Sequence, residues 1–331
     1  MLLCPEINLK MKKHNFSAGP CILPQEVMQK AAQAVVELDN SGLSLIEISH
    51  RSRAFIEIME KATSLAIEQL GLEGKGYKAM FLQGGASQQF LNVANNFLET
   101  KAGYANTGTW STKAIKEAKL LGEVVELSSS KDANFNYIPK GFDIPSDLDY
   151  LHITTNNTIF GTQYKVLPET NVPLISDSSS DIFSRSLDFS KFDLLYAGAQ
   201  KNMGPAGATL VVAKEAALGK VSRQVPSMLD YKIQADKDSM FNTPPVFAVY
   251  TSMLTLEWLK DKGGIAAIEK ENDAKAALMY GEIDRNPLFD GFAATEDRST
   301  MNATFTLNDA SQKERFEAMA KEAGLNGING H

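Results

Sequence analysis

Strand-like and helix-like segments alternate along most of this chain, and this alternation is the strongest constraint on its fold. A strand followed by a helix and another strand favours a parallel sheet with helices on its faces. The apolar runs that we interpret as strands lie at 79–82, 124–127, 151–155, 174–176, 194–196 and 209–212. We therefore predict an α/β fold with a mostly parallel, doubly wound sheet.

Proline, glycine and helical periodicity mark the segments between these strands. Further helices are predicted at 55–70, ended by Gly71, after the turn at 84–87 through Phe97, after Trp110 through Leu121, and at 244–262, 265–283 and 311–323. We expect Thr243 to be the N-cap of the helix at 244–262. The first helix is predicted to start at Pro24, with an inner face formed by Val27, Ala31, Val35 and Leu38.

The alternation of strands and helices stops near residue 260. After it, a helix, a strand at 301–307 and another helix form an α+β module of their own. Within this set of predicted elements the strand at 301–307 has no sheet neighbour. We therefore predict three parts: an N-terminal arm at 1–24, a large domain at 25–260 and a small domain at 261–331.

Composition narrows the classes of function. The 331 residues carry a net charge of −7 with both signs interspersed, so we do not expect a nucleic-acid partner. No apolar run is long enough for a membrane span or the core of a signal peptide, which predicts a cytoplasmic protein without membrane association. The two cysteines, Cys4 and Cys21, suit a reducing compartment, and the four histidines lack metal-ligand spacing, so no metal is expected.

Lys201 is placed where the apolar run at 194–196 gives way to a loop containing Gly204, Pro205 and Gly207. A lysine at a buried strand end is partly desolvated, which favours the neutral, nucleophilic amine. Such a residue can form a Schiff base, most commonly with pyridoxal phosphate. Taken alone, a surface lysine after a strand is an equally good interpretation.

Three other segments match what pyridoxal phosphate requires of a protein. Asp177 follows the strand at 174–176 and can keep the pyridine nitrogen protonated. The turn at 84–87 (GGAS) joins a strand to a helix, and its backbone amides can bind a phosphate. Trp110 can stack on the ring. Each feature also has a simpler interpretation: Asp177 could cap a turn, the segment at 84–87 could be only a tight connection, and Trp110 could be a core residue. Their order along the chain nevertheless favours the cofactor.

The chain resembles the phosphoserine aminotransferases, class-V members of the aspartate aminotransferase-like, fold type I pyridoxal phosphate enzymes. The resemblance runs from Asn15 to the last residue and depends on motifs at 15–20 (NFSAGP), 47–51 (EISHR), 84–87 (GGAS), 196–202 (YAGAQKN) and 240–245 (MFNTPP). It implies a mostly parallel sheet of the seven-stranded type between helices, with a smaller α+β domain at the C-terminus.

The same resemblance implies a transaminase of serine biosynthesis. Its substrates would be L-glutamate and the phosphorylated 2-keto acid 3-phosphohydroxypyruvate, and its products 2-oxoglutarate and O-phospho-L-serine. A phosphorylated hydroxythreonine in pyridoxine biosynthesis is a further implied substrate. The active unit would be a homodimer with shared active sites in the cytoplasm.

The resemblance also implies a role for each site residue. Lys201 would bind the cofactor aldehyde, Asp177 the pyridinium nitrogen and Trp110 the ring face. Thr158 would bond the ring oxygen or nearby atoms. The cofactor phosphate would be bound by Ala86, Ser87 and Gln200, together with Asn242 and Thr243 of the neighbouring subunit. The substrate would be bound by Arg51, which suits a carboxylate, and by His50 and His331.

Two features depart from the pattern of the resemblance. Ser87 stands where some members have an arginine, so phosphate recognition must depend on other groups. The resemblance also implies a basic, glycine-containing segment after His331, whose arginines help to bind the substrate phosphate. We therefore expect the sequence to be a truncated record.

Other functions compatible with these residues are a different fold type I aminotransferase, such as an alanine–glyoxylate enzyme, and an inactive truncated homologue that retains the cofactor. A cysteine desulfurase needs a catalytic cysteine near the lysine. Cys4 and Cys21 are far from Lys201 in sequence, which argues against it. A mononucleotide-binding turn at 84–87 is disfavoured because no Walker lysine and no G-x-G-x-x-G follow.

Overall fold

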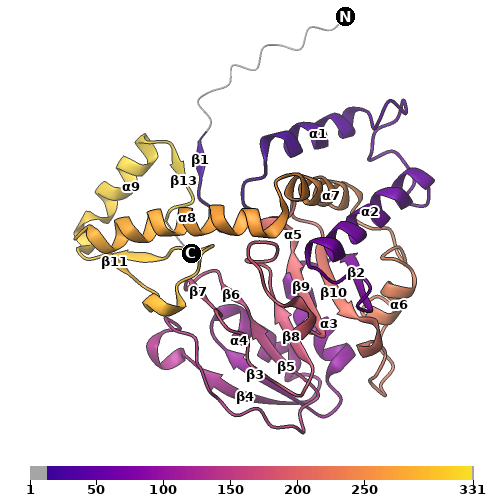
Figure 1. The fold of residues 1–331 in the computed structure, drawn as a ribbon, viewed down its shortest axis with the longest axis horizontal. Coiled ribbons are helices and arrows are strands. Elements are labelled where there is room, and N and C mark those ends of the chain that lie inside the picture. The colour runs from indigo at the N-terminus through magenta and orange to yellow at the C-terminus, as the bar shows by residue number, and fades with distance from the viewer. Residues whose placement is uncertain (1–12, 330–331) are drawn as a thin grey trace, which may run out of the picture.

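The computed structural model describes residues 13–329, and its centre is a seven-stranded sheet (Figure 1). The strand order is β2-β10-β9-β8-β5-β3-β4. Strands β9, β8, β5, β3 and β4 run parallel to one another, whereas β10 is antiparallel to both of its neighbours, β9 and β2. The predicted mostly parallel α/β fold is therefore confirmed.

The strands of this sheet include the six apolar runs predicted between residues 79 and 212, and one strand that was not predicted. They are β2 (Tyr77–Leu82), β3 (Lys101–Asn106), β4 (Glu123–Ser129), β5 (Leu151–Thr154), β8 (Leu174–Asp177), β9 (Leu194–Gly198) and β10 (Thr209–Lys214). Strand β3 was missed because its sequence, KAGYAN, lacks the β-branched residues that favour strands. It forms because β4 and β5 pair with it on both sides.

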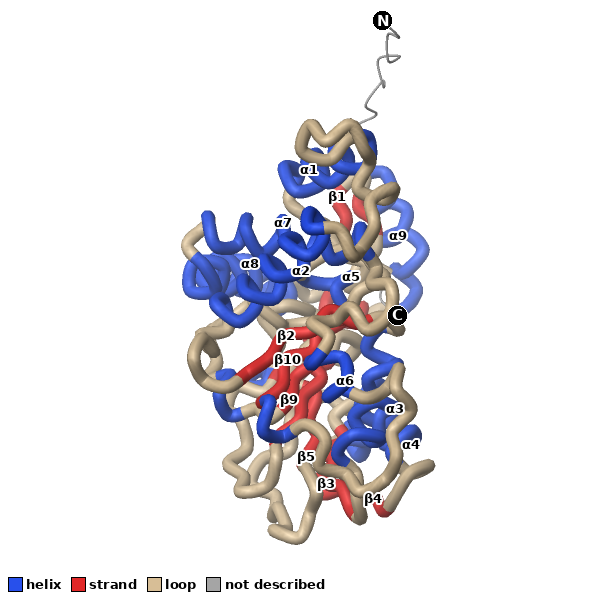
Figure 2. The backbone as a smooth tube through the Cα atoms, turned by 90° about the vertical axis from the view of Figure 1, so that its right-hand side faces the viewer, coloured by secondary structure: helices blue, strands red, loops and turns tan. Residues whose placement is uncertain are grey.

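Helices cover both faces of the sheet (Figure 2). In β10, Leu210 and Val212 belong to one hydrophobic core, while Val211 and Ala213 belong to the other. The first core is covered by α1 (Gln25–Val36), α2 (Arg53–Gln69) and α7 (Val246–Asp261), and the second by α3 (Gly85–Phe97), α4 (Thr109–Ala118) and α6 (Tyr231–Asp236). Strands buried on both faces explain the continuous apolar runs in the sequence.

Helix α1 follows Pro24 as predicted, and it buries most of the expected face. Val27, Ala31 and Leu38 are at most 3% exposed, but Val35 is 37% exposed, so its predicted burial was wrong. Ala34 is buried instead. At 3.6 residues per turn, position 34 lies about 20° from position 27 around the helix axis, whereas position 35 lies about 80° away and turns toward the surface.

The sequence predicted the C-terminus of α2 correctly but not the N-terminus of α7. Helix α2 ends as expected, with Gly71 in the left-handed region at φ 64°. Helix α7 begins at Val246 with Pro245 as its N-cap, so the prediction that Thr243 caps it was wrong. A proline disfavours helical backbone in the residue before it, and the helix starts only after Pro245.

The chain after α7 forms a separate group of elements, coloured orange to yellow in Figure 1. They are α8 (Gly264–Arg285), β11 (Phe289–Gly291), β12 (Phe305–Leu307), α9 (Lys313–Glu322) and β13 (Leu325–Asn326). Strand β12 pairs with β11, so the expectation that 301–307 has no sheet neighbour was wrong. Strand β1 (His14–Asn15) pairs in parallel with β13. The three-part division of the chain stays a prediction.

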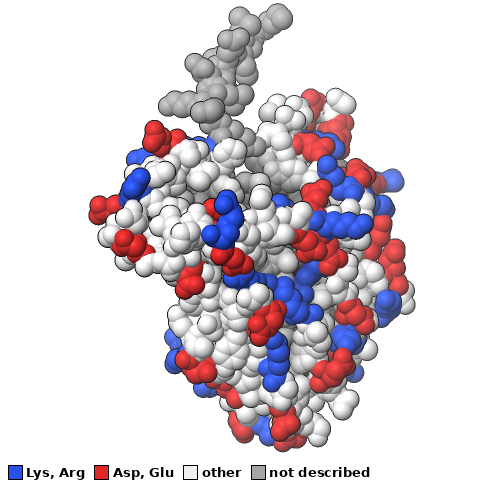
Figure 3. Space-filling view, turned by 60° about the vertical axis from the view of Figure 1, so that its left-hand side comes forward, with Lys and Arg blue, Asp and Glu red and all other residues white. Residues whose placement is uncertain are grey.

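Short elements complete the described chain. They are β6 (Asn156–Asn157), β7 (Thr162–Gln163), α5 (Ala199–Asn202) and the 3-10 helices Lys131–Ala133, Phe189–Lys191, Glu215–Ala217, Thr295–Asp297 and Ala310–Gln312. In residues 13–329 no helix has the length and apolar character needed to cross a membrane. Acidic and basic side chains are interspersed over the face shown in Figure 3.

Candidate active site

The predicted site residues follow strands whose carboxyl ends lie at one edge of the sheet. Asp177 at the end of β8 is in register with Thr154 of β5 and Tyr196 of β9. Thr209 at the start of β10 is in register with Gly198 and Leu82, the last residues of β9 and β2. In doubly wound sheets this edge is where ligands bind.

Lys201 lies in α5, directly after β9, and its amine contacts two of the predicted residues. Its Nζ donates a hydrogen bond to Thr158 Oγ1 at 2.7 Å and lies 5.8 Å from the centroid of the Trp110 ring. Gly19 of the N-terminal segment packs on the side chain of Lys201, since a Cβ added there would lie 3.0 Å from Lys201 Cγ. The fold thus brings Gly19, Trp110 and Thr158, from three separate segments, to the side chain of Lys201.

Burial changes the protonation of this amine. It lowers the pKa of Lys201 below its ordinary 10.5, while the charge of Asp177 and weaker effects of Cys21 and Asp181 partly oppose that shift. A lowered pKa leaves a larger fraction of neutral amine near neutral pH, which is the form that attacks an aldehyde.

We expect Lys201 of the cofactor-free protein to react with an amine-selective reagent at lower pH than the exposed lysines do. The rate should rise through a midpoint below 10.5, because only the neutral amine reacts. Mass spectrometry of labelled peptides over a pH series measures this for each lysine. A Lys201 midpoint equal to that of the exposed lysines would contradict the desolvation argument.

Asp177 presents a buried carboxylate at the same edge. Its side chain is 5% exposed, and Oδ1 accepts a hydrogen bond from the backbone N–H of Ser179 at 3.0 Å. Burial raises the pKa of Asp177, while the charge of Lys201 and the hydrogen bonds from Ser179 lower it in part. A buried carboxylate is best stabilised by a buried cation, and a protonated ring nitrogen is one.

The glycine turn after β2 has the backbone that an anion site needs. Gly84 and Gly85 have φ of 94° and 67°, and α3 begins at Gly85, so the amides of Ala86 and Ser87 lie in its first turn. First-turn amides have no partner within the helix. Gln83 Nε2 donates to the carbonyl oxygen of Thr243 at 2.8 Å, which places 242–243 beside this turn.

Gln200 joins the site to the N-terminal segment. Its carbonyl oxygen accepts a hydrogen bond from the backbone N–H of Cys21 at 2.9 Å. Cys21 is therefore close to Lys201, and the expectation that sequence distance separates them was wrong. Burial nevertheless raises the pKa of the Cys21 thiol, despite the charge of Lys201, which disfavours the thiolate that a desulfurase would need. Cys4 lies outside the described residues.

The predicted substrate residues are not brought to Lys201 within the described chain. Arg51 is exposed in a turn, and its backbone N–H donates to Ser49 Oγ at 3.2 Å. His50 Nε2 is buried without a hydrogen-bond partner among the described residues. No hydrogen bond or ion pair between residues 13 and 329 joins either of them to Lys201. His331 lies outside the described residues.

The structure also reveals a buried polar pair that the sequence did not indicate. His152 Nε2 is 2.9 Å from the hydroxyl oxygen of Tyr196, and the His152 ring stacks on Tyr104 with centroids 4.9 Å apart. Burial lowers the pKa of His152 to about 3, so the ring is neutral. Tyr196 is in register with Asp177, so the pair packs next to the carboxylate.

Replacing Tyr196 with phenylalanine should destabilise the fold by about 1–3 kcal/mol. His152 Nδ1 already lacks a partner among the described residues, and the substitution would leave both ring nitrogens buried and unpaired. Urea unfolding of the cofactor-free protein measures the change. The control is Tyr137→Phe, whose hydroxyl bonds Asp132 near the surface. Equal stability of the two variants would contradict the prediction.

A buried charged pair also lies within the electrostatic reach of Lys201. Asp181 accepts hydrogen bonds from Thr155 Oγ1 at 2.6 Å and from Arg185 Nη2 at 2.9 Å, and both charged residues are at most 8% exposed. The four-residue spacing of Asp181 and Arg185 is the feature of the sequence that could have indicated this pair. A buried pair of this kind costs stability if one partner is removed.

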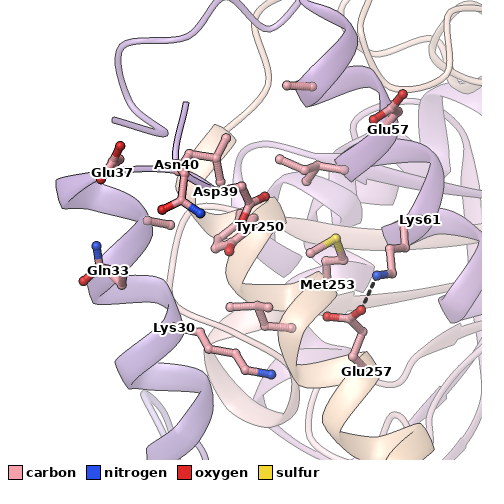
Figure 4. A pocket seen from close by; sticks show the side chains of 15 residues that line it. Lys30, Gln33, Glu37, Asp39, Asn40, Glu57, Lys61, Tyr250, Met253 and Glu257 are labelled. Carbon is pink, nitrogen blue, oxygen red and sulfur yellow. Dashed lines mark ion pairs between the residues drawn. The ribbon is translucent and has the colours of Figure 1, made fainter. Parts of the chain in front are cut away.

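The cavity in Figure 4 lies elsewhere, between α1, α2 and α7. Its volume is about 640 Å³, and an ion pair between Lys61 and Glu257 lies on its wall. Its lining includes no predicted site residue. We do not connect it with the chemistry of Lys201.

Comparisons with known proteins agree on one family. Residues 13–331 match the sequence model of the family Aminotransferase class-V. The phosphoserine aminotransferase of Flavobacterium johnsoniae is 63% identical over 323 residues, which are 97% of this chain and 91% of that protein.

Solved structures give the same result. The phosphoserine aminotransferase from Bacillus circulans subsp. alkalophilus has a TM-score of 0.94 and 38% identity, covering 97% of this chain and 91% of that one. A phosphoserine aminotransferase structure that describes radiation damage of its Schiff base has a TM-score of 0.94 and 44% identity, covering 97% and 90%. The chain belongs to the class-V aminotransferases and, among them, to the phosphoserine aminotransferases.

Proposed function

We propose that this chain transfers an amino group from L-glutamate to 3-phosphohydroxypyruvate, which yields 2-oxoglutarate and O-phospho-L-serine. It is a pyridoxal phosphate-dependent aminotransferase, as its family is. The observation that carries the proposal is the desolvated amine of Lys201, which contacts Thr158 and Trp110 and lies in the field of the buried Asp177 carboxylate.

The residues present fit pyridoxal phosphate. Trp110 Nε1 and Thr154 Oγ1 are buried without a hydrogen-bond partner among the described residues, which is costly unless a bound group or water satisfies them. The glycine turn at the start of α3 offers amides to a phosphate. Asp177 offers a buried negative charge to a protonated ring nitrogen.

Pyridoxal phosphate, when bound, supplies an aldehyde that exchanges amines and a ring that accepts electrons. Lys201 Nζ would bind this aldehyde until the substrate amine displaces it. The freed Nζ would then take the proton from the substrate α-carbon and return a proton in the following step. Asp177 would keep the ring nitrogen protonated, and Thr158 would orient the reacting atoms by its hydroxyl group.

The remaining predicted residues would bind the charged ends of cofactor and substrate. Ala86, Ser87 and Gln200 are proposed for the cofactor phosphate, and Asn242 and Thr243 for the phosphate in a neighbouring subunit. This makes the active unit a homodimer. Arg51 and His50 are proposed for the substrate carboxylate, and His331 stays a prediction.

Three further expectations stay proposals. The enzyme would work in the cytoplasm, and it would also accept a phosphorylated hydroxythreonine. The division at 24 and 260 into arm, large domain and small domain is supported by the end of α7 at Asp261 and the separate sheet of β11 and β12 that follows.

The test is the visible absorption spectrum of the purified chain loaded with pyridoxal phosphate. We expect the visible band to fade on addition of L-glutamate and to return on addition of 3-phosphohydroxypyruvate. A band that fades with L-alanine and returns only with glyoxylate would support the alanine–glyoxylate alternative. A band that responds to neither pair would support the inactive homologue.

A further inference from the structure

The hairpin that carries Thr158 is held in place by a buried asparagine. Asn156 is 2% exposed, and its Nδ2 donates to Ser180 Oγ at 2.8 Å and to Asn302 Oδ1 at 2.8 Å. Its Oδ1 accepts a hydrogen bond from Ser299 Oγ at 2.5 Å. The side chain of Asn156 thus joins the end of β5 to a segment more than a hundred residues away in sequence.

The far end of the hairpin contacts the same segment. The backbone N–H of Ser299 donates to the carbonyl of Gly161 at 2.8 Å, and Thr304 Oγ1 donates to the carbonyl of Phe160 at 3.1 Å. Gly161 has φ 67°, and a Cβ there would lie 2.7 Å from the carbonyl oxygen of Asn302. Backbone and side chains therefore fix the whole turn around Thr158 to 299–304.

Helix α8 holds this segment from the other side. The hydroxyl of Tyr280 donates to the carbonyl of Ser299 at 2.9 Å. Arg298 makes a bidentate pair with Asp284, with both distances 2.7 Å. Hydrogen bonds thus join α8 to Ser299, and Ser299 and Asn302 to Asn156. Thr158, two residues further along the hairpin, binds Lys201.

We propose that Asn156 is a positioning residue for Lys201: its side chain locks the hairpin at 156–163 to residues 299–302 and so holds the Thr158 hydroxyl against the amine. The proposal rests on the proposed function of Lys201. No hydrogen bond within residues 13–329 joins Asn156 to Lys201, so Asn156 acts through Thr158. Loosening the hairpin should admit water to the amine and misplace the hydroxyl.

The first experiment needs no turnover. Amine labelling of the cofactor-free protein over a pH series, read by mass spectrometry, gives the midpoint for Lys201. Asn156→Ala and Asn302→Ala should both move this midpoint upward, because a hydrated amine loses part of the effect of burial. Charged groups that influence the same amine are Asp177, Cys21 and Asp181, and none of these is altered.

One control variant separates the lock from general damage. Asn308→Ala removes hydrogen bonds to Pro287 and Phe289 in the same C-terminal group without touching the hairpin, and it should leave the midpoint unchanged. A shift in Asn308→Ala as large as in Asn302→Ala would overturn the proposal.

The second experiment is a double-mutant cycle on the loaded enzyme. Asn156→Ala should lower kcat about tenfold while changing KM about twofold or less, since it loosens the catalytic group and not a substrate contact. In the background of Thr158→Val the same substitution should have little further effect, because the two residues act through one hydroxyl. Equal effects in both backgrounds would overturn the proposal. The unaltered protein could prove inactive while Asn156→Ala and Asn302→Ala still move the Lys201 midpoint upward. That outcome would refute the proposed function but leave the positioning role of Asn156 standing.

Discussion

Replacing Lys201 with alanine should abolish the visible band of bound pyridoxal phosphate and lower transamination on the order of 10⁴-fold or more. Two proposed roles would be lost together, the covalent link to the cofactor and the base that moves the α-proton. Lys201 is the residue whose amine is buried at the carboxyl edge of the sheet with Thr158 and Trp110 around it. Absorption spectra and initial rates with L-glutamate measure both losses.

Lys113→Ala is the matched control for this substitution. The amine of Lys113 also lies over the Trp110 ring, 4.5 Å from its centroid, but its side chain is exposed on α4. This variant should keep both the visible band and the rate. If Lys201→Ala retained normal turnover, the catalytic role assigned to Lys201 would have to be abandoned.

Replacing Asp177 with asparagine should leave a protein that binds pyridoxal phosphate and transaminates about 10²–10³-fold more slowly. Removing one partner from a buried charge pair costs about 3–5 kcal/mol, and about 1.4 kcal/mol corresponds to a tenfold change. Asparagine keeps the shape of the side chain and can still accept the hydrogen bond from Ser179, so the fold should survive. Rates of each half-reaction, followed by the visible band, give the effect.

Asp193→Asn provides the comparison for Asp177→Asn. The Asp193 carboxylate accepts a hydrogen bond from the backbone N–H of Leu174, at the start of β8, whereas Asp177 ends the same strand. Because Asp193 lies at the opposite end of the strand, its substitution should change stability more than rate. Unchanged half-reaction rates in Asp177→Asn would show that a different carboxylate serves the ring nitrogen.

Local sequence patterns predicted most of the elements because each pattern reflects the surroundings of one segment. Runs such as 194–196 are apolar throughout because both sides of the sheet are covered, and Gly71 ends α2 because its backbone requires a positive φ. The misses also have local causes. Strand β3 has weak strand propensity, and the prolines at 244–245 displaced the start of α7.

The order of residues along the chain was enough to predict Lys201 and Asp177 as a pair. In a parallel sheet the carboxyl ends of all strands meet at one edge, so residues that follow different strands are neighbours whatever their separation in sequence. Thr158 and Trp110 lie around the same amine for the same reason. The glycine turn at 84–87 follows β2, which ends at that edge too.

Only the tertiary structure decided which distant loops pack against these strand ends. Nothing in the sequence indicated that Cys21 lies next to Gln200, that Asn156 binds Ser299 and Asn302, or that β12 pairs with β11. Such contacts depend on how whole elements pack, and the residues involved have no periodic pattern of their own. Periodicity and turn chemistry therefore determined the sheet and the residues at its edge, whereas long-range packing determined how those residues are held.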